Sequence, residues 1–135
     1  MKNYDIVYFK GNPHSGSLEQ HKSIDTSIIS CIDKYNYIVL DSEAKNLSQI
    51  SIPQAKIYIG FSRGSRYLKK LPNNTLKISI GGVKSSQVHL FTNSIDEILL
   101  GNISTSSMNA HFIMEEQHKK EIKSLINDFM LRLEL

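Results

Sequence analysis

A serine flanked by two glycines is the strongest chemical feature of the sequence. It stands in the run Gly60-Phe61-Ser62-Arg63-Gly64, directly after the apolar residues 56–59. A serine on a sharp turn between a strand and a helix has strained backbone angles, and small residues two positions before and after it let the chain pass without collision. The turn raises the hydroxyl above the sheet, beside helix N–H groups that stabilise developing negative charge. The pattern therefore predicts a nucleophile at Ser62. A tight turn in which Ser62 only caps a helix is the alternative.

Arginines stand next to this serine, at Arg63 and Arg66. An arginine offers a bidentate fork to a carboxylate or phosphate, so one of them could hold such a group on a substrate. Solvated side chains on the first turn of a helix are the alternative, and the sequence does not decide between the two.

A metal site is a rival interpretation of the histidines. His111, Glu115 and His118 are spaced at i, i+4 and i+7, which places them on one face of a helix if that helix begins early enough. However, residues 109–111 are typical of a turn, and no fourth ligand stands nearby. We therefore expect no metal and no other cofactor. The remaining histidines are expected in surface or sheet-face positions, namely His14, His21 and His89.

The elements that would position Ser62 follow a repeating order of strand, turn and helix. Apolar runs rich in β-branched and aromatic residues predict five strands, at residues 4–9, 37–40, 56–59, 76–80 and 88–91. Ser17 and Gln20 could form a capping box that opens the first helix. Weaker helical patterns cover residues 44–50 and 67–71, the second of them stopped by Pro72.

The last segment has the clearest helical pattern. Its apolar residues recur at i, i+3, i+4, i+7, i+8 and i+11, and they are Ile122, Leu125, Ile126, Phe129, Met130 and Leu133. One apolar stripe of this kind predicts a helix that lies on a core.

Strands that alternate with helices predict a three-layer, doubly wound α/β fold in one domain over residues 1–135. Right-handed crossovers favour a mostly parallel five-stranded sheet with the order 2-1-3-4-5. Only about seven residues separate the fourth and fifth strands, whereas a parallel crossover usually takes a dozen or more. That connection is either an extended crossover without a helix or an antiparallel hairpin.

Composition narrows the classes of function. The chain has 135 residues and a net charge of +3, which is too small and dispersed to predict binding to nucleic acid. No apolar run approaches the roughly 18 residues of a membrane helix, and residues 1–5 contain no apolar stretch ahead of a small-residue cleavage site, as a secretory signal would, so we expect a cytoplasmic protein. The single cysteine, Cys31, stands in an apolar helical run and is expected to be buried and inert.

With the turn at Ser62 and the alternating elements, the chain resembles the α/β-hydrolase superfamily. That family donates one oxyanion-hole N–H from a loop after an earlier strand, and residues 9–16 look like this loop, although Lys10 stands where the family often has histidine. The resemblance implies that the backbone N–H groups of Asn12 and Arg63 form the oxyanion hole, and that Gly60 and Gly64 shape the turn.

The resemblance also implies the other members of a catalytic triad. Residues 90–98 are similar to the family's acid-bearing stretch, which makes Asp96 the acid, and Asn109-Ala110-His111-Phe112 is similar to its histidine turn, which makes His111 the base. The order serine, acid, histidine is the family's order. Asp96 and His111 are only 15 positions apart (111 − 96), so Glu97 and Asp41 are alternative acids.

The expected function is hydrolysis of a small ester or thioester through an acyl-enzyme on Ser62. The family's first two strands and its lid have no counterpart here, so walls of the pocket could come from a second subunit or a partner protein. The positive charge of the chain permits, but does not indicate, an acidic carrier protein as a partner. Two other hypotheses remain open. One is a catalytically degenerate hydrolase fold that acts as a binding module, and the other is a flavodoxin-like module that binds an anion above Ser62.

Overall fold

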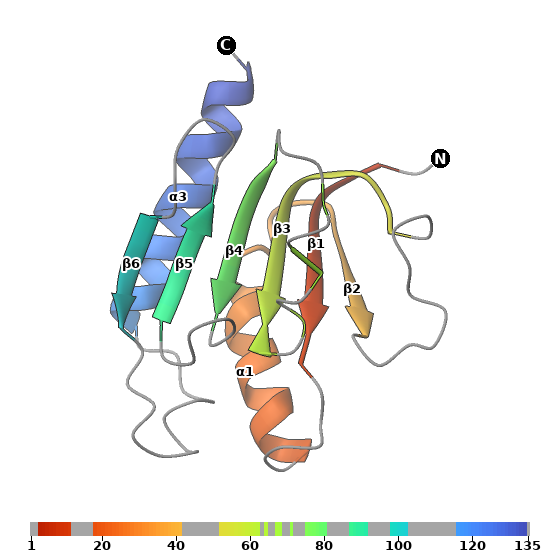
Figure 1. Cartoon of the computed structure of the whole chain (residues 1–135), viewed down its shortest axis with the longest axis vertical. Helices are drawn as coiled ribbons and strands as arrows, with labels where there is room; N and C mark the ends of the chain where they lie inside the picture. Colours follow the sequence, from red (N-terminus) through yellow and green to blue (C-terminus); the bar gives the residue numbers. More distant parts are fainter. Residues whose placement is uncertain are drawn as a thin grey trace.

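A computed structural model describes residues 3–11, 18–41, 52–62, 64, 67–68, 71, 75–80, 87–91, 98–102 and 116–134. Within these ranges the sheet has the order β2-β1-β3-β4-β5-β6 (Figure 1). The strands are β1 (Tyr4–Lys10), β2 (Tyr37–Asp41), β3 (Ala55–Phe61), β4 (Leu76–Ile80), β5 (Gln87–Phe91) and β6 (Ile98–Asn102). The described helices are α1 (Leu18–Ser30) and α3 (Glu116–Glu134).

The first four strands form the parallel α/β part that the sequence predicts. β1 pairs with β2 on one side and with β3 on the other, and β3 pairs with β4, all in parallel. The central residues of β1 and β3 are almost completely buried, which explains why these strands appear in the sequence as continuous apolar runs. The residues of β2, at the end of the strand order, are only partly buried.

The far half of the sheet corrects the five-stranded prediction. β5 lies beside β4 as expected, but it is antiparallel to it, so the short connection after β4 joins an antiparallel pair. β6 is a sixth strand, antiparallel to β5, with a register irregularity between Val88 and His89. The sheet is therefore parallel over four strands and antiparallel over the last two pairings.

Both described helices lie on one face of the sheet, drawn behind it in Figure 1. Ile24, Ile28 and Ile32 from α1 and its end pack in one buried cluster with Ile122 and Ile126 from α3. The sheet contributes the alternate residues whose side chains point to this face, namely Ile6, Tyr8, Ile57, Ile59, Phe61, Leu76, Ile78 and Ile80. Cys31 belongs to this cluster, which confirms that it is buried, and burial raises the pKa of its thiol.

The opposite face holds a second cluster around aromatic rings. Phe9 stacks on Tyr58 and on Tyr67, with ring centroids 6.3 Å and 5.1 Å apart. Leu68 and Leu71, from the segment after β3, are buried against these rings. This segment was expected to be helical, and a short 3₁₀ turn is described at residues 67–68.

Candidate active site at the carboxyl ends of β1 and β3

The sheet has a switch point between β1 and β3. The chain leaves β1 toward β2 on one side, and the next strand returns to the other side of β1. In open α/β sheets, ligands bind in the crevice outside the carboxyl ends of strands at such a point. Gly11 follows β1 and Ser62 follows β3, so both lie at the carboxyl edge of the sheet beside this switch point.

Ser62 has an unusual backbone. Its φ is +53°, and among the described residues it is the only one other than glycine with a positive φ. For a residue with a Cβ, this left-handed conformation costs roughly 1–2 kcal/mol. A strained residue at the end of a central strand is a typical position for a functional group, and the Ser62 side chain is partly exposed there.

Two close contacts hold the turn around Ser62 against β1. A Cβ on Gly64 would lie 2.1 Å from the carbonyl oxygen of Phe9, so only glycine fits at this position. On the other strand end, a Cβ on Gly11 would lie 2.9 Å from the ring of Phe61. The ends of β1 and β3 are therefore packed into each other through backbone and ring, which fixes where the chain can turn. Gly60 is buried in β3, where it pairs with Phe9.

His21 lies beneath this turn, and the expectation of a surface histidine is wrong. Only 5% of its surface is exposed, and its ring meets that of Phe61 edge-on, with centroids 6.3 Å apart. The signal was present in the sequence, because His21 precedes Ile24 by three positions and Ile28 by seven. It therefore belongs to the stripe of α1 that faces the sheet.

A buried hydrogen bond ties α1 to β1 one turn further along the helix. The hydroxyl of Tyr8 donates to Oδ1 of Asp25 over 2.5 Å. Burial, together with the Asp25 carboxylate, raises the pKa of Tyr8 well above its usual value, so the hydroxyl keeps its proton and remains a donor. This bond sets the position of α1, and with it the position of His21 behind the turn.

The other residues assigned from the sequence lie outside the described part of the chain. This applies to Asn12, Arg63, Asp96 and His111, and to the alternative acid Glu97. For His118, which belongs to the metal hypothesis together with His111 and Glu115, only the backbone in α3 is described.

The strands nevertheless show which edge of the sheet these segments leave from. β5 begins at Gln87, beside the carboxyl end of β4, which is the edge of the sheet where Ser62 lies. β6 ends at Asn102, which pairs with Gln87 and so lies at the same edge. Figure 1 shows α3 beginning nearby. The connection that contains His111 thus starts and ends near this edge.

The connection that contains Asp96 starts at the other edge. β5 runs against β4 and ends at Phe91, which pairs with Lys77 near the beginning of β4. Asp41, in contrast, is the last residue of β2 and is paired with Lys10 at the edge where Ser62 lies. Two strand spacings of about 4.8 Å separate β2 from β3, so Asp41 lies roughly 10 Å to the side of the Ser62 strand.

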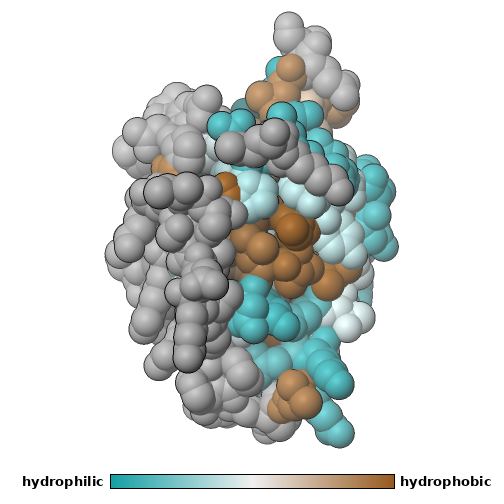
Figure 2. All heavy atoms as spheres, turned by 90° about the vertical axis from the view of Figure 1, so that its right-hand side faces the viewer, coloured by the Kyte–Doolittle hydropathy of each residue, from teal (hydrophilic) through white to brown (hydrophobic). Residues whose placement is uncertain are grey.

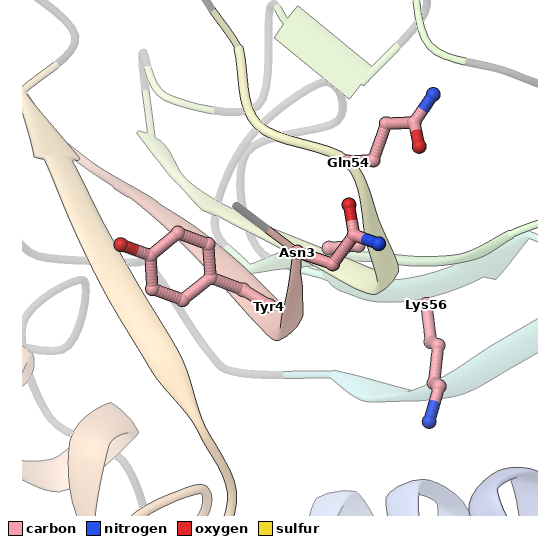
Figure 3. A pocket seen from close by; sticks show the side chains of 5 residues that line it. Asn3, Tyr4, Gln54 and Lys56 are labelled. Atoms are coloured by element: carbon pink, nitrogen blue, oxygen red, sulfur yellow. The ribbon is translucent and has the colours of Figure 1, made fainter. Parts of the chain in front are cut away.

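A hollow of about 210 Å³ lies at the opposite, amino ends of β1 and β3 (Figure 3). Asn3, Tyr4, Gln54, Ala55 and Lys56 line it. Figure 3 shows Tyr4 and Lys56 pointing away from each other, so the polar groups do not converge on one point. This hollow therefore lies at the opposite edge of the sheet from the turn at Ser62.

In the part of the chain that the structure describes, no group of three or more histidine, cysteine, aspartate or glutamate side chains is placed to hold a metal ion. Neither of the described helices combines the length and the apolar character needed to cross a membrane.

In comparisons with known proteins, no family model matches the chain, and neither a curated protein nor a solved structure matches it. The geometry of the chain itself is therefore the basis on which its function is argued.

Proposed function

We propose that this protein is a serine hydrolase that cleaves a small ester or thioester, with Ser62 as the nucleophile in a minimal, three-layer α/β-hydrolase-like fold. The observation that supports this most is the positive φ of Ser62 at the carboxyl end of β3. A helix cap does not need this conformation, because capping residues ordinarily have β-region angles. A nucleophile that must project from a sharp turn does need strain of this kind.

The reaction would proceed in two stages. Oγ of Ser62 attacks the acyl carbonyl carbon while His111 takes the hydroxyl proton and passes it to the leaving alkoxide or thiolate. The backbone N–H groups of Arg63 and Asn12 stabilise the oxyanion, each contributing about 3 kcal/mol. Water, deprotonated by His111, then attacks the acyl-enzyme and releases the acid.

The acid that orients His111 is a choice among Asp96, Glu97 and Asp41. The strand directions favour Asp41, because β2 ends at the edge of the sheet where Ser62 lies, whereas β5, which precedes Asp96, ends at the opposite edge. Asp41→Asn is therefore expected to slow acylation more than Asp96→Asn. The opposite order would restore the assignment from the family resemblance.

Labelling with a fluorophosphonate tests the proposal, because the reagent bonds only to an activated serine. The folded protein should be labelled, Ser62→Ala should lose labelling completely, and His111→Ala should slow it at least about a hundredfold. Ser23→Ala is the matched control, since Ser23 is an exposed serine on α1 and its loss should change nothing. Absence of labelling in the folded protein would contradict the proposal and favour the binding module.

A further inference from the structure

His21 is buried in a molecule that leaves several apolar side chains on its surface. Leu18 in the first turn of α1 is exposed, whereas His21, one turn further along the helix, is only 5% exposed. The apolar residues of β2 are partly exposed, and Figure 2, which looks at the molecule from the side of β2, shows hydrophobic residues gathered at the centre of that face. Hydrophobicity alone therefore does not explain why His21 is buried, and its place in the fold must.

The ring of His21 packs against Phe61, the residue directly before Ser62. The two ring centroids are 6.3 Å apart and the ring planes meet at 77°, which is an edge-to-face arrangement. Aromatic rings prefer this arrangement because the positive edge of one ring meets the negative face of the other. Phe61 is completely buried, so its ring is a fixed part of the core at the carboxyl end of β3.

The backbone that follows β1 supplies a second contact for Phe61. A Cβ placed on Gly11 would lie 2.9 Å from the ring of Phe61 and 3.3 Å from its carbonyl oxygen. The ring and the carbonyl of Phe61 therefore both lie close against the chain at Gly11. Phe61 is thus held by two elements, the end of β1 and the first turns of α1.

The placement of Phe61 bears directly on the backbone angle of Ser62. The φ of Ser62 is the rotation about its N–Cα bond, and the carbonyl carbon of Phe61 is one of the four atoms that define it. Beyond the serine, Gly64 lies so close to β1 that a Cβ would be 2.1 Å from the carbonyl oxygen of Phe9. The φ of +53° is therefore kept by a restrained residue on each side of Ser62.

The helix that carries His21 has anchors of its own. The hydroxyl of Tyr8 donates to Asp25, one turn after His21, over 2.5 Å. Ile24 and Ile28 are buried in the same cluster as Phe61. A substitution at His21 can therefore remove the support of Phe61 while α1 stays on the sheet.

We propose that His21 is a positioning residue for Ser62, whose ring keeps Phe61 in place and so maintains the backbone angle from which the serine hydroxyl projects. This inference rests on the proposed function, because the position of Ser62 affects a rate only if Ser62 reacts. His21 acts through Phe61 and does not touch the substrate. A misplacement of about 1 Å can cost about a hundredfold in rate, so loss of this support should slow the reaction of Ser62.

The kinetics of fluorophosphonate labelling test this role. In His21→Ala the limiting rate of the covalent step should fall at least about tenfold, while the reagent concentration that gives half of this rate stays within about threefold. A purely structural role would lower the fraction of protein that is labelled and leave the rate constant of the folded protein unchanged. Circular dichroism shows which variants are folded, and His21→Leu, which fills the space without a ring, decides if His21→Ala is not.

Two further variants separate the contact with Phe61 from the general packing of α1. His21→Phe again presents a ring to Phe61, so its labelling rate should lie within about threefold of the wild-type rate. Ile28→Val is the matched control, because it removes a methyl group from the same buried cluster two turns further along α1. Ile28→Val should be less stable than the wild type and should be labelled at the wild-type rate.

A backbone measurement distinguishes failure of this inference from failure of the proposed function. The one-bond coupling between Cα and Hα of Ser62 differs between positive and negative φ, so NMR reports the angle without any reaction. The coupling should change in His21→Ala and stay unchanged in His21→Phe and Ile28→Val. If either the coupling or the labelling rate is unchanged in the folded alanine or leucine variant, the role of His21 is overturned. If the wild type is not labelled at all, the hydrolase proposal fails, and the coupling alone decides whether His21 holds the turn.

Discussion

At their carboxyl ends β1 and β3 are crowded together, whereas at their amino ends the same two strands border an open hollow. The crowded end has Gly64 against the carbonyl of Phe9, and the open end has Lys56 and Asp5 in an ion pair of 3.3 Å with both side chains partly in water. Both ends contain polar residues, but among the described residues only Ser62, at the carboxyl end, combines a side chain with a positive φ. The comparison indicates that the two ends differ in conformational restraint more than in polarity.

The largest effect is expected from a single methyl group at the crowded end. Gly64→Ala would place a Cβ in contact with backbone that cannot move aside, so we expect a loss of at least about 3 kcal/mol in the free energy of unfolding, measured with urea. Gly11→Ala is the matched control, because its Cβ would lie 2.9 Å from the ring of Phe61 and no closer than 3.3 Å to backbone, so a smaller cost of roughly 1–2 kcal/mol is expected. If Gly64→Ala were as stable as the wild type, the carboxyl ends of β1 and β3 would not be packed more tightly than their amino ends.

A smaller effect is expected from Tyr58, whose hydroxyl organises the amino end. It donates to the carbonyl of Pro53 and accepts from the N–H of Ala55, each over 3.0 Å, so Tyr58→Phe should cost roughly 1–2 kcal/mol at pH 7.

The cost of Tyr58→Phe should also depend on pH. Burial raises the pKa of the Tyr58 hydroxyl, so the folded chain keeps this proton where the unfolded chain loses it. The stabilisation is complete below the unfolded pKa of about 10 and is lost as the pH rises from there through the folded value. Urea titrations of the wild type and Tyr58→Phe between pH 8 and 11 would measure how the difference in their free energies of unfolding changes with pH. Tyr8→Phe, which retains Tyr58, is the comparison variant. A pH-independent difference between wild type and Tyr58→Phe would contradict this account.

The smallest effect is expected at the ion pair of the open end. Lys56→Gln removes the contact with Asp5, but 54% of the Lys56 side chain is exposed, so water screens the pair. The free energy of unfolding should change by less than about 0.5 kcal/mol. Lys119→Gln, which breaks the surface pair with Glu116, should behave in the same way. A cost of several times this value at Lys56 would show that the open end is restrained after all.

The parallel half of the fold was predictable because β1 and β3 are buried on both faces and appear as continuous apolar runs. A short apolar run marked β2 and alternating apolar residues marked β4, and crossover rules gave the order of the four strands. β6 was missed because its sequence, Ile98-Leu99-Leu100-Gly101-Asn102, is short and contains a glycine, and because the family resemblance had assigned its first residue to the acid segment. Whether β4 and β5 ran parallel could not be decided from a seven-residue connection alone.

The limits of an apolar stripe are set by the neighbouring elements and are not visible in the sequence. Ile122 and Ile126 are buried under the sheet, but Leu133 continues the same stripe and is 50% exposed. Leu18 lies at the other kind of boundary, in the first turn of α1, and is 63% exposed. The residues of α1 that belong to the core cluster, Ile24 and Ile28, lie further along the helix. For the site, the position of Ser62 followed from its motif, whereas its backbone angle depends on contacts with β1 that are distant in the sequence.

The contact between Gly64 and Phe9 has a consequence for the order of assembly. The turn at Ser62 is held by a strand more than fifty positions earlier in the chain, so nothing in residues 55–68 alone would keep the serine in its left-handed conformation. An excised peptide with this motif would relax to ordinary angles. The left-handed conformation of Ser62 can arise only after β1 and β3 have docked, and it is lost when these two strands separate.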